Sequence, residues 1–232
     1  MQAVILAAGE GVRMRPLTLE RPKALVPIAG RPLLEYIIDA LPREADEIIL
    51  VVGYRGDMIG NHFGNEYDGR CITYVHQWMP AGTAHALSMA RPLLRDERFI
   101  LLCGDDLHGA AAFEKALAYP LSILAATHED PRKFGVLELN DDHTLKNIIE
   151  KPEVPPTNLI STGAMILDKR IFNYEVVRHE NGEYYMTYPL GLFARDHPIM
   201  VVKQDFWVPV GYPEDISVAE ERLGVLQSIS LD

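Results

Sequence analysis

The feature that most constrains the fold is a short apolar run near the start of the chain, followed at once by a loop with glycines. Residues 3–8 are all apolar, which predicts a fully buried strand. Gly9 and Gly11 follow, and glycine allows a sharp turn and a close approach of the backbone to a ligand. Arg13, Arg15 and Lys23 are among the cations that come next. A buried strand that leads into a glycine loop with cations is typical of a phosphate-binding site.

This loop differs from two common phosphate-binding motifs. A Walker loop needs G-K-[ST] after the glycines, and the chain has no such sequence there. The dinucleotide motif G-x-G-x-x-G needs a third glycine where the chain has Met14. The missing glycine disfavours one alternative for the chain, a nucleotide-binding dehydrogenase module.

The length and composition of the chain indicate one large α/β domain. It has 232 residues, of which 48% are hydrophobic, and this is enough for a substantial core. We find no low-complexity segment, no internal repeat and no linker between independently folding parts. A single domain over residues 1–232 is therefore expected.

Charge and hydropathy exclude several kinds of partner. The net charge of −11 argues against nucleic acid, because binding to a phosphate backbone needs clustered cations. The longest apolar runs are only as long as strands, so neither a membrane-spanning helix nor a membrane partner is expected. The first strand begins directly after Met1, which leaves no room for a signal peptide and predicts a cytoplasmic protein. Cys71 and Cys103 lie in predicted strands without metal-ligand spacing, so we expect reduced thiols in the core.

Strand and helix patterns alternate along the first half of the chain. Strands are predicted at residues 3–8, 47–52, 71–76, 98–103 and 121–127, and helices at residues 32–41, 57–63, 83–94 and 110–118. This alternation predicts an α/β fold that is Rossmann-like and doubly wound, with a mainly parallel mixed sheet and helices on both faces.

The second half of the chain has a different pattern. Residues 135–139 and 144–149 flank a turn signal at residues 140–142, which predicts a β-hairpin insertion. Further elements are predicted as a strand at residues 160–167, a helix at 186–195, one or two strands within 199–210 and a closing helix at 215–229.

Polar residues after the parallel strands are candidates for binding, because ligands bind beyond the carboxyl ends of such strands. Gln77 follows the third predicted strand, and its amide can both donate to and accept from a base edge. Gly82 allows a close backbone approach at the start of the next helix. Asp105 follows the fourth strand, where a carboxylate opposite the phosphate loop is well placed to hold Mg²⁺. Its neighbour Asp106 is expected to shape the turn.

Several motifs resemble those of one enzyme family. The string L-A-A-G-x-G-x-R-M-x-P-L-T-x-x-x-P-K closely resembles the signature of the sugar-phosphate nucleotidyltransferases, also called nucleotide-sugar pyrophosphorylases. Within that family the chain is similar to glucose-1-phosphate thymidylyltransferases and to N-acetylglucosamine-1-phosphate uridylyltransferase domains. The segment Q-x-x-P-x-G-T-A from Gln77 and the G-D-[ND] motif at Asp105 add to the likeness, and the segments at residues 134–136, 150–152 and 162–163 extend it over nearly the whole chain. The resemblance implies an enzyme that uses Mg²⁺ to join a sugar-1-phosphate to a nucleoside triphosphate, with UTP or dTTP favoured, and releases pyrophosphate.

The resemblance also implies roles for individual residues. Residues 1–127 would mainly bind the nucleotide, through Ala7, Ala8, Gly9, Gly11, Arg13, Gln77 and Gly82. Residues 128–232 would mainly bind the sugar phosphate, and the expected ligands of that substrate are Lys23, Gly135, Glu150, Lys151 and Gly163. The expected catalytic residues are Arg13, Lys23, Asp105 and Lys151, with Asp105 as the metal ligand.

Two positions depart from the family pattern. Pro209 stands where the motif W-x-D-x-G has an aspartate near the metal, and a proline side chain cannot bind a metal. Ser161 stands where the N-acetylglucosamine enzymes have asparagine, although residues 182–187 resemble a segment of those enzymes. The sugar therefore stays open.

Other functional interpretations of the sequence stay open as well. The same chemistry on muramic-acid-1-phosphate or phosphocholine is the nearest of these. A non-catalytic regulatory subunit that binds nucleotide sugars is another, since the family aspartate is lost at Pro209. The oligomeric state is open too, with a homo-oligomer as one option.

Overall fold

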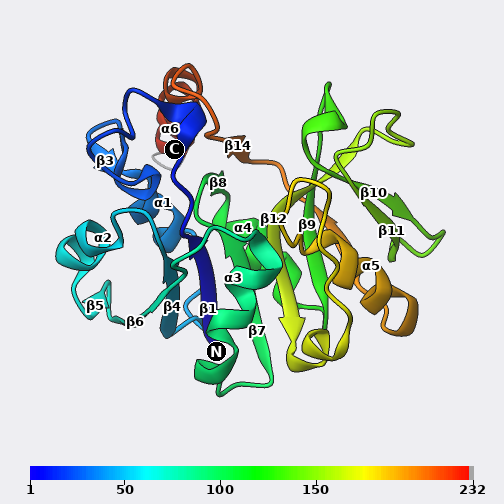
Figure 1. Ribbon diagram of the computed structural model, residues 1–232. Helices are drawn as coiled ribbons and strands as arrows, with labels where there is room; N and C mark the ends of the chain where they lie inside the picture. Colours follow the sequence, from blue (N-terminus) through cyan, green and yellow to red (C-terminus); the bar gives the residue numbers. More distant parts are fainter. Residues whose placement is uncertain (230–232) are drawn as a thin grey trace.

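The structure, a computed structural model, describes residues 1–229 and is built around a mixed sheet of ten strands (Figure 1). Its strands lie in the order β11-β10-β12-β7-β1-β4-β6-β5, with β9 paired to β12 and β13 paired to β9. The strands are β1 (Gln2–Ala7), β2 (Pro27–Ile28), β3 (Arg31–Pro32), β4 (Glu47–Val52), β5 (Glu66–Tyr67), β6 (Arg70–His76), β7 (Arg98–Cys103), β8 (Asp106–His108), β9 (Ser122–Thr127), β10 (Gly135–Leu139), β11 (Leu145–Glu150), β12 (Leu159–Asp168), β13 (Met200–Lys203) and β14 (Trp207–Pro209).

The helices lie close to the predicted ranges. The α-helices are α1 (Leu33–Asp39), α2 (Gly56–Phe63), α3 (Thr83–Ala90), α4 (Ala110–Leu117), α5 (Thr187–Asp196) and α6 (Asp215–Ile229), and the 3-10 helices are η1 (Val12–Met14), η2 (Lys23–Leu25), η3 (Arg91–Leu93), η4 (Pro131–Lys133) and η5 (Lys169–Asn173). Pro92 ends the α-helical hydrogen bonding of α3, which continues as η3, as proline in this position requires. Among residues 1–229, no helix combines the length and the apolar character that spanning a bilayer requires.

Strand β1 lies at the centre of the sheet, as its apolar sequence predicts. It pairs in parallel with β4 on one edge and with β7 on the other, so that Ile5 lies between Leu50 and Leu102. Strand β6 continues the parallel order beyond β4. Because neighbours cover both edges and both faces of β1, an uninterrupted apolar run suits it better than an alternating one.

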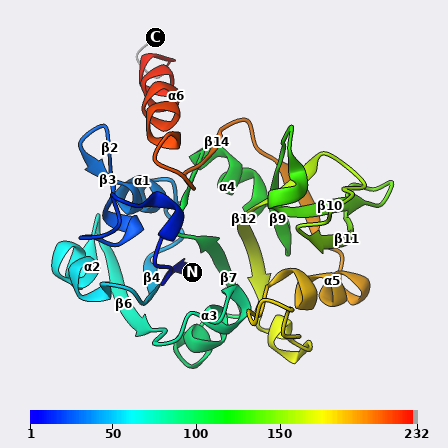
Figure 2. The ribbon, with the colours of Figure 1, turned by 45° about the horizontal axis from the view of Figure 1, so that its top comes forward.

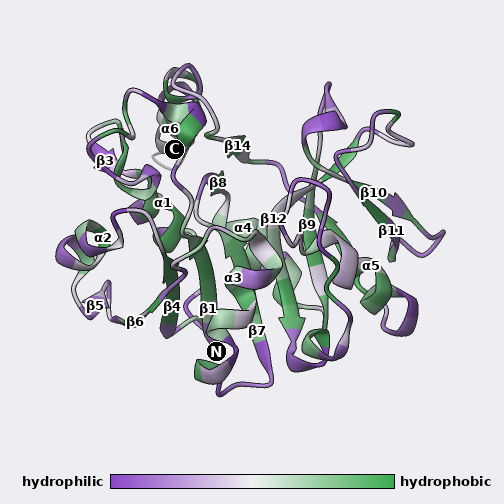
Figure 3. Cartoon of the chain, viewed as in Figure 1, coloured by the Kyte–Doolittle hydropathy of each residue, from purple (hydrophilic) through white to green (hydrophobic). Residues whose placement is uncertain are grey.

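Helices cover both faces of the sheet and produce two hydrophobic cores. Ile5 and its alternate neighbours in β1 pack into a core that includes residues of α1, α2 and α4. Val4 points to the other face, where the core includes residues of α3 and α5. In Figure 3 the central strands are mostly hydrophobic, whereas many of the loops at the periphery are hydrophilic. The predicted Rossmann-like, doubly wound α/β fold is confirmed.

The second half of the chain adds antiparallel strands to this sheet. Strand β12 runs antiparallel to both β7 and β9, and the hairpin β10–β11 forms the far edge, with Gly135 opposite Glu150. The predicted hairpin is therefore confirmed. Strand β14 leaves the main sheet and pairs with β8 in a small separate sheet. Helix α6 follows β14 and extends away from the sheet (Figure 2).

The expectation that both cysteines are core thiols is wrong for Cys71. Its side chain is exposed, whereas Cys103, at the end of β7, is half-buried. Successive side chains of a strand point to opposite faces, and at the start of β6 it is Arg70 and Ile72 that turn inward. Cys71, between them, turns outward.

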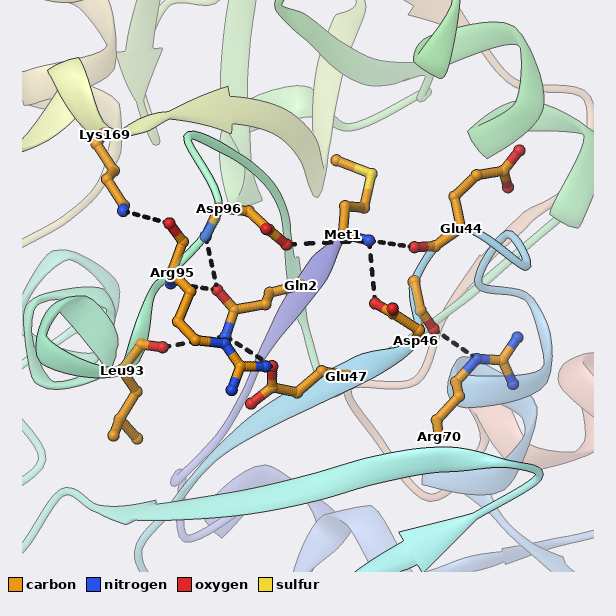
Figure 4. Close-up of polar contacts among 11 residues, drawn as sticks. Met1, Gln2, Glu44, Asp46, Glu47, Arg70, Leu93, Arg95, Asp96 and Lys169 are labelled. Atoms are coloured by element: carbon orange, nitrogen blue, oxygen red, sulfur yellow. Dashed lines mark hydrogen bonds and ion pairs between the residues drawn. The ribbon is translucent and has the colours of Figure 1, made fainter.

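A buried polar network holds the amino end of β1, opposite the end that leads into the glycine loop (Figure 4). The side chain of Gln2 is buried, and its Oε1 accepts hydrogen bonds from the backbone N–H groups of Arg95 at 2.5 Å and Asp96 at 3.2 Å. Its Nε2 donates to Glu47 Oε2 and to the carbonyl oxygen of Leu93, both at 3.0 Å. One amide thereby connects β1 to β4 and to the chain that enters β7.

We expect Gln2→Leu to destabilise the fold, because it would leave buried donors and acceptors without partners. The cost should reach at least about 1–3 kcal/mol in the free energy of unfolding, measured by urea denaturation. The control is Asp96→Asn, since the exposed Asp96 carboxylate lies 3.9 Å from the amino group of Met1 and such pairs contribute no more than about 1 kcal/mol. Equal losses in the two variants would contradict this account of Gln2.

Candidate active site

Two neighbouring cavities lie at the carboxyl ends of β1 and β7, where ligands bind in doubly wound sheets. The first cavity has a volume of about 340 Å³ and the second of about 420 Å³, within the range of small-molecule sites. The first cavity is defined by Ala8, Gly11, Lys23, Gln77 and Pro80. The second cavity is defined by Phe134, Glu150, Lys151, Gly163 and Tyr212.

The two cavities share part of their walls. Arg13, Asp105 and Tyr185 line both of them. Lys23 lines the first cavity and Lys151 lines the second, so cations lie on both sides of the shared Asp105 carboxylate. The arrangement is suited to two anionic ligands that meet at this carboxylate.

Nearly all of the predicted site residues come together here. The residues predicted to bind the nucleotide all line the first cavity: Ala7, Ala8, Gly9, Gly11, Arg13, Gln77 and Gly82. Of those predicted to bind the sugar phosphate, Glu150, Lys151 and Gly163 line the second cavity and Lys23 the first. Gly135 stands next to the lining residue Phe134, where an added Cβ would meet Thr187 at 3.1 Å and Ile148 at 3.2 Å. The roles of these residues stay predictions.

The two glycines of the loop after β1, Gly9 and Gly11, have different structural roles. Gly11 has a φ of 62°, and a Cβ there would meet Thr18 at 3.0 Å and Lys23 at 3.1 Å. The hydroxyl of Thr18 donates to the carbonyl oxygen of Gly11 at 2.7 Å, which closes the loop. At Gly9 an added Cβ would have no atom within 4 Å in the described chain. Packing therefore requires glycine at position 11, while Gly9 leaves open space at the first cavity.

Lys23 and Asp105 form an ion pair between the glycine loop and the end of β7. Lys23 Nζ lies 3.0 Å from Asp105 Oδ2. The lysine side chain is 12% exposed and that of Asp105 is 42% exposed, so the carboxylate is the more open partner. The pair places the ammonium beside the shared wall and leaves carboxylate oxygen facing both cavities.

Asp106 has a structural environment that differs from that of Asp105. Its Oδ2 accepts a hydrogen bond from Trp207 Nε1 at 3.0 Å, and its backbone pairs with that of Pro209 between β8 and β14. Burial, followed by the negative charge of Asp105, raises the pKa of Asp106 well above its usual range. This carboxyl joins β8 to β14, and it places Pro209 at the second cavity, beside Asp105.

Gln77 is buried and is already held by two groups of the chain. Its Nε2 donates to the carbonyl oxygen of Gly82 at 3.3 Å and lies 2.8 Å from His85 Nδ1. A carbonyl oxygen can only accept, so the amide nitrogen points to these partners and Oε1 is left for another donor. Gly82 has a φ of 89°, and a Cβ there would come within 2.5 Å of the backbone of Tyr184. The backbone segment that Gly82 approaches closely is thus the one at residues 182–187.

Lys151 stands where the hairpin turns into the second cavity. Its φ is 42°, and its backbone N–H donates to the carbonyl oxygen of Phe134 at 3.0 Å. Its Nζ lies 3.1 Å from Glu150 Oε1 and 4.7 Å from the ring centroid of Tyr185. Burial lowers the pKa of Lys151, but the charge and hydrogen bond of Glu150 outweigh this, so the pKa is raised. The ammonium stays charged and faces the cavity.

Sequence reasoning missed four residues at or near the cavities. They are His85, Lys133, Tyr185 and Tyr212. Tyr185 had a signal in the likeness of residues 182–187 to a family segment, whereas the others stand in no motif. His85 lies only eight residues after Gln77, on α3, whereas Tyr185 and Tyr212 meet Lys151 and Arg13 through packing between segments that are distant in sequence.

The residues present fit a divalent cation that is shared with a ligand. Within residues 1–229 no group of three or more His, Cys, Asp or Glu side chains could hold a metal ion. Asp105 supplies a hard carboxylate oxygen, and Mg²⁺ is often held by one or two carboxylates together with substrate phosphates and water. A cation at Asp105 would therefore depend on phosphate oxygens for its other ligands.

Comparison with known proteins identifies the family. A family model described as Nucleotidyl transferase matches residues 2–224. The chain belongs to this family. It is 36% identical over 235 residues to the UTP–glucose-1-phosphate uridylyltransferase AglF of Haloferax volcanii, with 96% of each chain covered. The predicted sugar-phosphate nucleotidyltransferase family and enzyme class are confirmed, and such enzymes generally use a divalent metal.

Other relatives of this nucleotidyltransferase are longer. The bifunctional protein GlmU of Methanocaldococcus jannaschii is 34% identical, and the match covers 100% of this chain but 56% of that protein. Among solved structures, a Bacillus anthracis protein described as a glucose-1-phosphate thymidylyltransferase matches with a TM-score of 0.84 and 23% identity. That match covers 95% of this chain and 94% of the other, and it supports the fold.

A buried polar network connects the two halves of this nucleotidyltransferase beneath the cavities. Gln204 Nε2 donates to Thr162 Oγ1 at 2.6 Å, and the Thr162 hydroxyl donates to the carbonyl oxygen of Leu124 at 3.0 Å. His108 Nδ1 lies 3.4 Å from Gln204 Oε1, while its buried Nε2 has no partner within the described residues. Burial lowers the pKa of His108 to about 4.

This histidine should make stability depend on pH. Its pKa is about 4 in the folded state and ordinarily near 6.5, so the unfolded chain binds the proton first as pH falls. The contribution of neutral His108 to the free energy of unfolding is complete above pH ~6.5. It is lost as the pH falls toward ~4, at up to about 1.4 kcal/mol per pH unit. We expect His108→Asn, which keeps a neutral donor, to flatten the pH dependence of the unfolding free energy in urea. The control is the exposed His143→Asn, and equal slopes in both variants would contradict the assignment.

Proposed function

We propose that this nucleotidyltransferase joins a sugar-1-phosphate to UTP or dTTP and releases pyrophosphate. The first cavity holds the nucleoside triphosphate and the second holds the sugar-1-phosphate. In this proposal residues 1–127 bind mainly the nucleotide and residues 128–232 mainly the sugar phosphate, within one domain. The name of the Haloferax relative supports UTP and glucose-1-phosphate as the first pair of substrates to test.

The observation that carries this proposal is the shared wall of the two cavities. Arg13 and Asp105 line both cavities, with Lys23 in one and Lys151 in the other. Two phosphate-bearing substrates, one in each cavity, would place their phosphates next to each other at this wall. Proximity and charge neutralisation are the main contributions that an enzyme makes to phosphoryl transfer.

The reaction is an in-line displacement. An oxygen of the sugar-1-phosphate attacks the α-phosphorus of the triphosphate, and the bond from that phosphorus to the bridging oxygen of the β-phosphate breaks. Lys151 holds the phosphate of the sugar, and Lys23 lies between the reacting phosphates. Arg13 neutralises the pyrophosphate that leaves with the bonding electrons. Glu150 and the backbone at Gly135 and Gly163 orient the sugar.

We assign the metal position to Asp105, with Mg²⁺ as the ion. The loss of the family aspartate at Pro209 leaves one carboxylate for it, since Asp106 is engaged by Trp207. A bound Mg²⁺ would supply positive charge to the phosphate oxygens. Asp105 would orient the triphosphate through this contact, while Lys23 keeps the carboxylate in place.

Base selection is assigned to Gln77. Its Nε2 is turned toward Gly82 and His85, so Oε1 is available to accept from the N3–H group that uracil and thymine share. Cytosine has an acceptor at this position and would be rejected. His85 contacts Gln77 Nε2 and thereby keeps the amide in the orientation that presents Oε1 to the base.

A panel that crosses five triphosphates with several sugar-1-phosphates, read out as pyrophosphate release in Mg²⁺, tests the proposal. The triphosphates are UTP, dTTP, CTP, ATP and GTP. We expect release with UTP or dTTP. Gln77→Ala should narrow the preference for these over CTP by about 5- to 150-fold, since an unpaired buried polar group costs about 1–3 kcal/mol.

Two further variants tie the activity to this site. Lys23→Met should lower turnover by about 10²-fold or more, the scale of losing one preorganised electrostatic contact. Lys146→Met removes an equal charge from the exposed surface of β11 and should leave turnover unchanged. Lack of release with every pair, or normal turnover in Lys23→Met, would contradict the proposal. Pyrophosphate release with phosphocholine or muramic-acid-1-phosphate alone would show that the acceptor substrate is one of these compounds.

A magnesium titration tests the single-carboxylate site. Asp105→Asn should abolish most turnover, because no second carboxylate at position 209 can hold the ion. Pro209→Asp should lower the Mg²⁺ concentration that gives half-maximal rate, and Pro209→Ala controls for the loss of proline alone. Full activity in Asp105→Asn would contradict the assignment. An inactive parent protein beside an active Pro209→Asp variant would favour a regulatory subunit.

A further inference from the structure

Tyr212 brings together two cations that come from distant segments. It lies in the turn after β14, and its ring centroid is 5.2 Å from Arg13 Cζ, in η1 of the glycine loop. The same centroid is 5.9 Å from Lys133 Nζ, at the end of η4. All three residues line the second cavity, and Arg13 also lines the first. An aromatic ring within about 6 Å of a cation attracts it through the negative face of the ring.

The backbone of this turn is held firmly. The N–H groups of Gly211 and Tyr212 both donate to Asp215 Oδ2, each at 2.7 Å, at the start of α6. The N–H of Asp215 donates back to the carbonyl oxygen of Tyr212 at 3.1 Å. These reciprocal bonds fix the position of the ring relative to the sheet. The ring therefore serves as a fixed support for two long and otherwise mobile side chains.

Neither cation is neutralised by a close carboxylate. None of the ion pairs within residues 1–229 includes Arg13, although its neighbour Arg15 pairs with Glu10 at 3.6 Å. Lys133 Nζ lies 4.0 Å from Asp130 Oδ2, at the limit of an ion pair, and its side chain is 57% exposed. In a chain with a net charge of −11, Arg13 and Lys133 are therefore two cations that line the same cavity with N–H donors open to a ligand.

The type of partner matters for function. A carboxylate would restrain these side chains, but it would also cancel their charge and occupy their N–H groups. An aromatic face restrains a cation while its charge and its in-plane donors stay available to an anion. Arg13 and Lys133 on one ring are therefore suited to an anion that spans both of them, such as a group of two linked phosphates.

We propose that Arg13 and Lys133, positioned by Tyr212, form the binding site for the pyrophosphate group that leaves the triphosphate. This inference rests on the proposed function and adds to it a binding residue, Lys133, and a positioning residue, Tyr212. Lys133 comes from the part of the chain that is assigned mainly to the sugar phosphate. The pyrophosphate site thus takes residues from both halves and lies beside Arg13, at the wall that the two cavities share.

Direct binding of inorganic pyrophosphate in Mg²⁺, measured by calorimetry, tests this site independently of turnover. Tyr212→Leu removes the ring and should weaken pyrophosphate binding by about 5- to 10-fold, as the loss of two exposed cation–ring contacts implies. Tyr212→Phe keeps the ring and should stay within about 2-fold of the parent protein. Lys133→Met should weaken binding by about 10-fold, the scale of one charged hydrogen bond. Lys146→Met is the charge-matched control and should bind normally.

Two further measurements separate positioning from a general structural effect. In steady state, the inhibition constant of pyrophosphate should rise in Tyr212→Leu while the KM for the sugar-1-phosphate stays constant. In the double variant of Tyr212→Leu with Lys133→Met, the loss should be smaller than the product of the single losses, because the ring acts partly through Lys133. Urea unfolding of each variant confirms that the fold is kept, and Lys133→Met tests the site even if Tyr212→Leu does not fold.

Several results would overturn the inference while leaving the proposed function intact. Normal pyrophosphate binding in Lys133→Met or in Tyr212→Leu is one of them. An equal loss in Tyr212→Phe and Tyr212→Leu is another, since it would remove the ring from the explanation. A change confined to the KM for the sugar-1-phosphate would place Lys133 on the other substrate. The proposed function itself fails on a different result, which is a parent protein that releases no pyrophosphate with any substrate pair.

Discussion

The site depends on the side chains that position its cations. Several cations lie close together at one edge of the sheet, and each must be held in place while it stays able to bind phosphate. The chain as a whole is acidic, so positive charge has to be concentrated locally. Each cation has a different support. Lys23 rests on a carboxylate, Lys151 on a carboxylate and an aromatic ring, and Arg13 on an aromatic ring alone.

The sheet brings these supports together from distant parts of the chain. Parallel strands end at the same edge, so the loop after β1 and the turn after β7 meet there and form the Lys23–Asp105 pair. The antiparallel strand β12 then carries the hairpin alongside, which places the second cavity next to the first. At the opposite end of β1 the buried amide of Gln2 connects it to its neighbours. The position of the loop therefore depends on a strand that is held at both ends.

The replacement at Pro209 shows how a local change can be accommodated. The small sheet of β8 and β14 still brings position 209 beside Asp106 and into the wall of the second cavity. A hydrogen bond from Trp207 holds Asp106 in this sheet. The architecture around the metal position is thus kept although one carboxylate is missing. One carboxylate is sufficient for an ion that takes its other ligands from phosphates and water.

The sequence by itself determined the fold class, most helices and strands, and the set of residues that gather at the cavities, because periodicity, turn chemistry and motifs are local properties of a chain. It placed Asp105 beside the phosphate loop, since the topological rule for parallel strands is general. Only the tertiary structure decided that Cys71 faces solvent, that β14 leaves the main sheet, and that His85 supports Gln77. It also decided that Tyr212 carries cations from two halves of the chain. The side on which Cys71 lies depends on which of the alternating positions of β6 face the core. The other features depend on which segments pack against one another, and that packing is set by the whole fold and leaves no periodic trace in the sequence.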